Sequence, residues 1–309
     1  MNDNMALMGK SGLVPFGIMT GDAGRWMVGY QFMLDDMNGN LAGTQEISDA
    51  QILKQFPAAP TDMTMQMHMA MLMYAPTNKL TFSAMVPYVW KEMNNITAAG
   101  GRFVERADGI GDVELRGGYC VFDSKDSRHR LLLNGGVGLP SGSIDATMDG
   151  MRLEYCMQVG SGTFSLLPGF TYLGQAAPWG WGADFNVIQR LGRNGNGYRL
   201  GNGYTASSWV ARQLASWVSL CVGLRGDVWE NVHGADPTLD QTFEQTMDPD
   251  LQGGKRLNAF FGINFSPCCE RFLKNQQIFV QGDLPIVESL DGPQLQTSWN
   301  IRIAWQYAF

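Results

Sequence analysis

The sequence contains no long uninterrupted apolar stretch, although 45% of its 309 residues are hydrophobic. A transmembrane helix needs about 18 or more consecutive apolar residues, so no such helix is expected. The net charge of −7 offers no basic surface for a nucleic acid. These absences exclude a helical membrane protein and argue against a nucleic-acid-binding one.

Cysteine is also sparse. The five cysteines form no CxxC pair, and their odd number does not suit a zinc site or a disulfide framework. The neighbours Cys268 and Cys269 could form a strained vicinal disulfide, but disulfide geometry disfavours adjacent residues, so we expect a turn there. The first ten residues lack a basic segment followed by an apolar one. We therefore expect that a signal peptide has been removed or that none exists.

Glycine is abundant, with 38 residues, which argues against a helical protein because glycine destabilises helix interiors. Long segments instead alternate between apolar and polar residues, the pattern of a β-strand with one apolar face. The clearest case is the C-terminal segment, which is longer than the usual soluble strand of about 5–6 residues. One face of this segment consists of Trp299, Ile301, Ile303, Trp305, Tyr307 and Phe309.

The alternating segments predict an all-β fold, a closed antiparallel transmembrane β-barrel of about 12 strands in an outer membrane. The connections alternate between short ones, expected to be periplasmic turns, and long ones rich in Gly, Asp and Asn, expected to be outer loops. A soluble β-sandwich should have shorter strands, and a β-propeller should show a blade repeat, which we do not find. The expected strands are 25–35, 63–75, 79–91, 110–122, 130–140, 161–173, 179–191, 204–215, 217–230, 255–266, 276–285 and 296–309.

This pattern divides the chain into an N-terminal periplasmic or lumenal segment, residues 1–24, and the barrel, residues 25–309. Tryptophan, tyrosine and phenylalanine lie near many strand ends, as in the aromatic girdles of membrane proteins. The last strand should close the barrel against the first. We expect outer-membrane lipid to surround the barrel.

The most unusual segment places six methionines, at every second position from Met63 to Met73, on one face of one strand. If this face continues the polar side of the first strand, which carries Met27 and Met33, the methionines point into the lumen. Thioethers are soft ligands that select Cu(I). The alternative is packing, because methionine is flexible and fills irregular space. The candidate metal ligands are Met27, Met33, Met65, Met67, Met69, Met71, Met85 and His68.

Charged residues lie opposite the apolar positions of several strands and are expected to face the lumen. They could form an eyelet that sorts solutes by charge. Alternatively, they form ion pairs that brace the wall, because buried charges must be paired. The predicted lumen charges are Asp112, Glu114, Arg116, Arg190, Arg212, Arg225, Asp227 and Arg302. The sequence has only three histidines and lacks the GxSxG motif that carries the nucleophile of many hydrolases. We therefore predict that the protein is not an enzyme.

Several stretches resemble the methionine-rich branch of the "MetA-pathway of phenol degradation" family of outer-membrane transporters. They are MTMQMHMAMLMY (63–74), GIGD (109–112), GLPSGSID (138–145), MQVGSGTFSLLP (157–168), NGYRLG (196–201), DPDLQGGKR (248–256) and DGPQL (291–295). The resemblance implies one outer-membrane barrel that acts as a channel, and it leaves the solute open.

We therefore expect a porin-like transport channel for a small solute, with copper or a hydrophobic compound as candidates and no resident cofactor other than a candidate copper ion. The alternative is a structural or anchoring barrel with a plugged lumen. Its loops would bind a periplasmic or extracellular protein partner.

Overall fold

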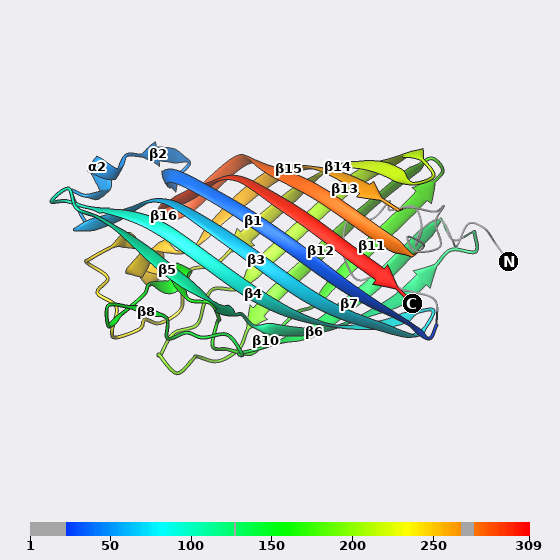
Figure 1. Ribbon diagram of the computed structural model, residues 1–309, viewed down its shortest axis with the longest axis horizontal. Helices are drawn as coiled ribbons and strands as arrows, with labels where there is room; N and C mark the ends of the chain where they lie inside the picture. The colour runs from blue at the N-terminus through cyan, green and yellow to red at the C-terminus, as the bar shows by residue number, and fades with distance from the viewer. Residues whose placement is uncertain (1–22, 127, 267–274) are drawn as a thin grey trace.

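The computed structural model describes residues 23–126, 128–266 and 275–309, and these form one barrel of tilted antiparallel strands (Figure 1). Among these residues, no helix is long and apolar enough to cross a membrane. Most of the predicted N-terminal segment, and the pair Cys268–Cys269, lie outside the described residues.

Eleven labelled strands form the closed ring in the described residues. Each pairs with the next, and β12 pairs with β13 to complete the circle. In spatial order they are β1 (Arg25–Gly43), β3 (Ala58–Thr77), β4 (Leu80–Thr97), β6 (Val113–Asp123), β7 (His129–Leu139), β11 (Gly169–Ala176), β12 (Trp179–Arg190), β13 (Gly203–Ala215), β14 (Val218–Trp229), β15 (Gly254–Phe265) and β16 (Gln276–Ala308).

The last element, β16, supplies two passes through the wall. Its 33 residues would span about 110 Å if straight, at about 3.3 Å per residue. Instead its ends meet, because the backbone N–H of Ala308 donates to the carbonyl of Asn275 at 3.1 Å. One half pairs with β15 and the other with β1. The wall thus has twelve passes, and the prediction that the C-terminal strand closes against the first is confirmed.

The outer surface of the barrel is apolar, as a lipid-facing wall requires. In β3, for example, Leu72 is exposed and both of its neighbours are buried. The same alternation runs along the other strands and confirms the predicted faces, except in the segment 204–215, where the pattern is shifted by one residue. Exposed large side chains from around the ring include Tyr30, Phe82, Leu115, Leu133, Phe170, Val210, Leu220, Phe261, Leu284 and Ile303.

One end of the barrel carries long connections and the other carries short turns (Figure 1). The strands β1, β3 and β4 have 19, 20 and 18 residues, well beyond the about 9–11 needed to cross a membrane. They continue into the end with the long loops. The smaller elements are β2 (Gln45–Ile47), α2 (Asp49–Ile52), β5 (Arg102–Ile110), β8 (Thr147–Met148), β9 (Met151–Arg152), η1 (Tyr155–Met157), β10 (Ser165–Leu166), η2 (Gln245–Met247) and η3 (Pro249–Leu251).

One predicted strand, 161–173, differs from the structure. Its first part belongs to a loop, and the rest is divided into the short β10 and β11. Pro168 lies between the two pieces and has no N–H to donate to a ladder, which explains the break.

Candidate functional site: the inner face of the barrel wall

The predicted methionine face spans three neighbouring strands in register. Met67 of β3 lies directly opposite Met33 of β1. On the other side of β3, Met71 lies opposite Met85 of β4. Directly opposed residues in a ladder share one face and have Cβ atoms about 4.5–5.5 Å apart. The thioethers of the three strands therefore form one continuous group.

Burial shows which face carries these side chains. Met71 and Met73 are 8% and 3% exposed, whereas Leu72 between them is 45% exposed. Because side chains alternate along a strand, the methionines share the inner face and Leu72 lies on the outer one. The sequence left this direction open. The structure thus brings together the seven methionines of the predicted set on one face.

His68 is not on this face. It lies one position from Met67 and Met69, so its side chain points to the opposite side of the strand. There its Nδ1 is 2.6 Å from the hydroxyl oxygen of the outward-facing Tyr30, and its ring lies 5.2 Å from that of Phe32. The prediction that His68 joins the methionines is therefore wrong, because the period of a strand is two.

Most of the predicted lumen charges occur in ion pairs. Arg116 contacts Glu114 at 2.8 Å, and Arg225 contacts Asp227 at 3.1 Å. A carboxylate that the prediction missed, Asp283, joins Arg225 at 2.8 Å and Arg302 at 3.3 Å. Asp283 joins separate passes of the wall through its two arginines. This pairing favours a bracing role, since unpaired charges on a partly buried wall would be costly.

Two of the predicted lumen charges, Asp112 and Arg190, instead form hydrogen bonds with outer loops. The carboxylate of Asp112 accepts hydrogen bonds from the backbone N–H groups of Gly142 at 3.0 Å and Ser161 at 2.9 Å. The guanidinium Nε of Arg190 donates to the carbonyl of Gly201 at 3.1 Å. Both contacts fix loop segments to the ends of strands.

Arg212 is not a lumen charge. It lies opposite Leu220 of β14 and Trp179 of β12 in the ladder, and both of these face outward. Its guanidinium carbon is 5.2 Å from the centre of the Trp179 ring, a cation–π contact on the outer surface. The alternation in 204–215 is shifted by one residue from the predicted face, because Ala211 and not Arg212 is buried.

Sequence reasoning also missed three aromatic rings that lie against the inner wall. Each covers a glycine on an adjacent strand: Trp209 covers Gly182, Phe260 covers Gly223 and Phe279 covers Gly262. A Cβ at any of these glycines would overlap the ring. The rings are only 3–5% exposed, so they lie along the wall rather than in open space. An inward aromatic opposite a glycine is the pattern that could have revealed them.

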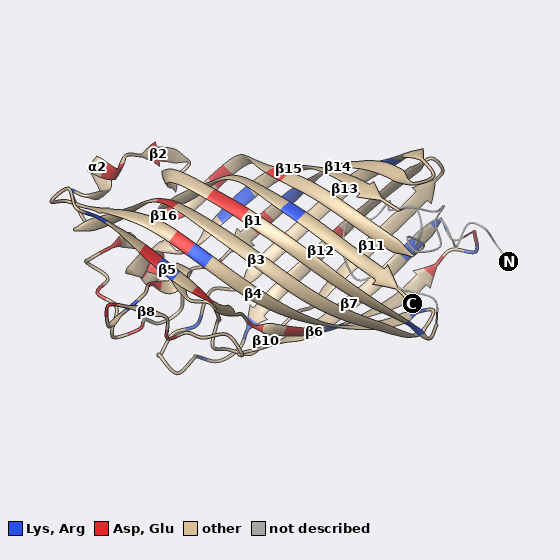
Figure 2. Ribbon diagram, viewed as in Figure 1, with Lys and Arg blue, Asp and Glu red and all other residues tan. Residues whose placement is uncertain are grey.

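The rings belong to a larger apolar cluster of the inner face. This cluster, which includes Phe260 and Trp209, draws its members from six strands and makes this part of the interior apolar. Figure 2 shows few charged residues along much of the barrel's length and more around the loop end. The other members of the cluster are Cys120, Leu132, Leu173, Ala211 and Cys221.

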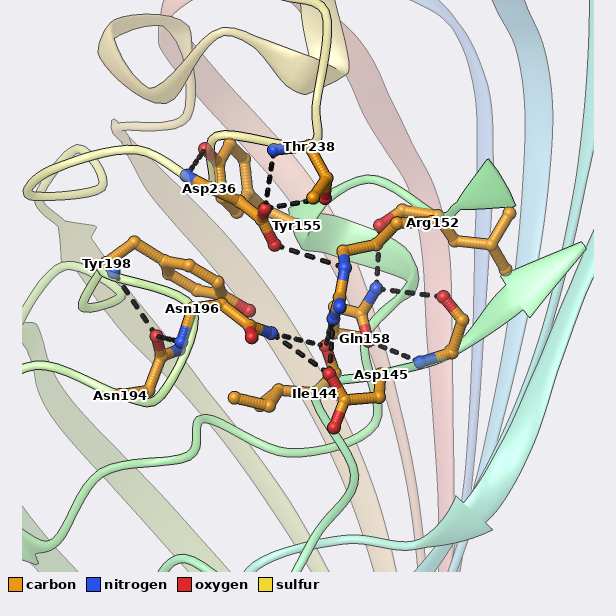
Figure 3. A network of polar contacts seen from close by, with 12 residues as sticks. Ile144, Asp145, Arg152, Tyr155, Gln158, Asn194, Asn196, Tyr198, Asp236 and Thr238 are labelled. Atoms are coloured by element: carbon orange, nitrogen blue, oxygen red, sulfur yellow. Dashed lines mark hydrogen bonds and ion pairs between the residues drawn. The ribbon is translucent and has the colours of Figure 1, made fainter. Parts of the chain in front are cut away.

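The outer loops pack on one another through a polar network (Figure 3). The guanidinium of Arg152 donates to the carbonyl of Ile144 at 2.8 Å and pairs with Asp236 at 3.3 Å. The backbone N–H of Asp236 donates to the Tyr155 hydroxyl at 3.0 Å. Burial raises the pKa of Tyr198, whose ring packs edge-on to that of Tyr155, to about 12. Three loops are thus joined into a cap, comprising residues 141–164, 192–202 and 230–253.

Three buried carboxyl groups lie at the base of this cap. Glu105, Glu154 and Glu244 are 5%, 0% and 0% exposed and come from β5 and two different loops. Desolvation by burial raises the pKa of all three, and that of Glu244 reaches about 8. Repulsion between Glu154 and the other two adds to its shift. With a pKa of about 8, the Glu244 carboxyl keeps its proton near neutral pH, which lowers the negative charge of the buried cluster.

The closed ladder, apolar outer surface and polar loop end define a β-barrel of the outer membrane. The family model described as "Putative MetA-pathway of phenol degradation" matches residues 57–265, and the chain belongs to this family. The resemblance to this family is thereby confirmed. No curated protein sequence matches the chain significantly.

Solved structures with a similar fold come from outer membranes. A channel from Pseudomonas putida F1 has a TM-score of 0.66 and 12% identity, and the match covers 96% of this chain and 100% of that one. The P. putida toluene transporter TodX has a TM-score of 0.45 and 14% identity, over 94% of this chain and 91% of that one. The first of these similarities agrees with the barrel fold predicted from the sequence.

Proposed function

We propose that this barrel is a channel for a small, largely apolar solute. The solute would move along an inner face made of methionine side chains on β1, β3 and β4. The observation that carries the proposal is the continuous group of inward-facing thioethers from Met73 to Met65, in register with Met27, Met33 and Met85. Met71 and Met73 are buried and the others are half-buried. Methionine side chains are apolar, polarisable and adaptable, which suits loose contact with solutes of variable shape.

The aromatic rings of Trp209 and Phe260 support the same proposal. Each packs against a glycine and is almost fully buried, so it makes the wall apolar without projecting across the interior. Ion pairs such as Arg225–Asp283 satisfy the charged groups of the wall among themselves. A solute would therefore not need a charge of its own to enter.

A planar-bilayer measurement tests this function. The full chain should carry an ion current, and a small aromatic hydrocarbon such as toluene should block that current in a dose-dependent way. A sugar of similar size is the matched probe and should block at least tenfold less effectively. Equal block by the sugar would contradict an apolar pathway.

A specific observation favours the second candidate, an anchoring barrel with a protein partner. The outer loops form a cap with its own buried side chains, including Tyr155, Tyr198, Val232 and Leu239. A permanently closed cap would stop flux. In that case no current should appear under any condition in the same bilayer measurement, and cap deletion should restore it.

A further inference from the structure

A second group of methionines lies beyond the predicted metal set, where the strands reach the outer cap. Met37 of β1 is directly opposite Met63 of β3. Met63 is in turn directly opposite Met93 of β4. Three thioethers thus lie in a row on the inner face, with neighbouring Cβ atoms about 4.5–5.5 Å apart.

The cap loop 141–164 contributes further sulfur atoms to this group. Met157 of η1 is fully buried and packs in one cluster with Met63 and Met93. Met148 and the thiol-bearing Cys156 pack against the same cluster. Five thioethers and one thiol, from three strands and one loop, therefore pack in one cluster together with apolar residues such as Ala107 and Leu153. We name this group, Met37, Met63, Met93, Met148, Cys156 and Met157, the outer sulfur cluster.

Polar contacts fix the cysteine-bearing segment in place. The Lys91 ammonium donates to the backbone carbonyls of Cys156 at 2.6 Å and Gln158 at 2.8 Å. The Cys156 thiol donates to the Oε1 oxygen of Glu154 at 3.7 Å. Lys91 comes from β4, as does Met93. The same strand thus holds the loop cysteine and one methionine of the cluster.

Simple packing does not require this composition. Immobilising a methionine loses more side-chain entropy than immobilising a leucine. Leucines would therefore fill the same apolar space at a smaller entropic cost than the five methionines around the thiol. Sulfur ligands have a distinct use, because thiolate and thioether groups select soft ions such as Cu(I).

We propose that the outer sulfur cluster binds one soft monovalent metal ion, Cu(I) or Ag(I), through the sulfur of Cys156 and the thioethers of Met63, Met93 and Met157. On binding, the metal–sulfur bond to Cys156 forms as its S–H bond breaks, and one proton leaves to solvent. The monovalent ion and the thiolate cancel in charge, so the buried site gains no net charge and no electron is transferred. The site lies at the cap end of the inner face, beyond Met65, and does not depend on the solute of the channel.

The test is Cu(I) binding by the full chain in detergent, without oxygen, in competition with bicinchoninate. The background carries Cys268→Ser and Cys269→Ser to remove two other thiols. The unmodified cluster should take up one Cu(I) per chain. Replacing Met63, Met93 and Met157 together with leucine should weaken binding at least 100-fold, as should Cys156→Ser.

The matched control replaces Met67, Met69 and Met71 with leucine. These three methionines lie on the inner face outside the cluster, and their loss should change the affinity less than twofold. Leucine conserves volume well enough for the barrel to fold, which the heat-dependent shift of folded barrels on gels verifies for each variant. Full-affinity binding by the Met63/Met93/Met157 variant, or loss of binding in the control, would overturn the site. Neither result bears on the current measurement proposed for the channel.

Discussion

The buried carboxyl of Glu244 makes the outer cap sensitive to pH in a defined direction. In the closed cap its pKa is about 8, raised by desolvation. In an opened cap the side chain reaches water and its pKa returns to the ordinary value of 4.5. Between these two values the closed form binds more protons than the open form. The free energy of opening therefore falls as pH rises, and it levels off above about pH 8.

The magnitude follows from the size of the shift. Each pH unit changes the free energy of opening by about 1.4 kcal/mol, so the full range corresponds to about 5 kcal/mol as an upper bound. Between pH 5.5 and pH 8 the free energy of opening should fall by about 3 kcal/mol, which raises the opening equilibrium constant by up to about 300-fold. Glu105 and Glu154 act in the same direction because burial raises the pKa of each.

Hydrogen exchange of the cap at the two pH values, corrected for intrinsic exchange rates, measures this effect. Protection of the segment 231–253 should fall strongly from pH 5.5 to pH 8. Glu244→Gln keeps the shape of the side chain without its charge and should remove most of the dependence. Glu46→Gln, at an exposed site in β2, is the matched control and should leave it intact. Equal protection at both pH values in the unmodified protein would refute the reasoning, as would greater protection at pH 8.

Two further predictions concern the barrel wall. Gly223→Leu should displace the Phe260 ring and destabilise the barrel by about 1–3 kcal/mol, whereas Gly226→Ala, where the space beside the glycine is open, should change the urea midpoint little. Asp283→Ala leaves two arginines without their shared carboxylate and should cost about 3–5 kcal/mol, while Asp126→Ala removes an exposed pair and should cost less than about 1 kcal/mol. Urea midpoints that do not differ within either pair would contradict these assignments.

The barrel could be predicted from the sequence because its determinants are local. Alternation with a period of two fixes which side chains face lipid, and the C-terminal segment shows this over its full length. The turn composition then separates the strands. The prediction was less accurate where the apolar–polar alternation is shifted by one residue, as at Arg212, or where Pro168 interrupts the hydrogen-bonded ladder.

The candidate site was harder to predict because it depends on contacts between distant residues. The methionine row of β3 is plain in the sequence, but its neighbours Met33 and Met85 join it only through strand register. His68 is the opposite case. It is next to the methionines in the sequence, but its side chain lies on the other face of the barrel wall. The outer sulfur cluster draws Met157 from a loop, for which the sequence offers no periodicity.

The central claim is that a small apolar solute moves along the inner methionine face. The most direct test compares two triple variants of Met67, Met69 and Met71, one with glutamine and one with leucine, in planar bilayers. Glutamine should raise the toluene concentration that blocks half of the current at least fivefold, which corresponds to about 1 kcal/mol of lost apolar contact. Leucine should change it less than twofold. Identical block of the two variants would contradict the account.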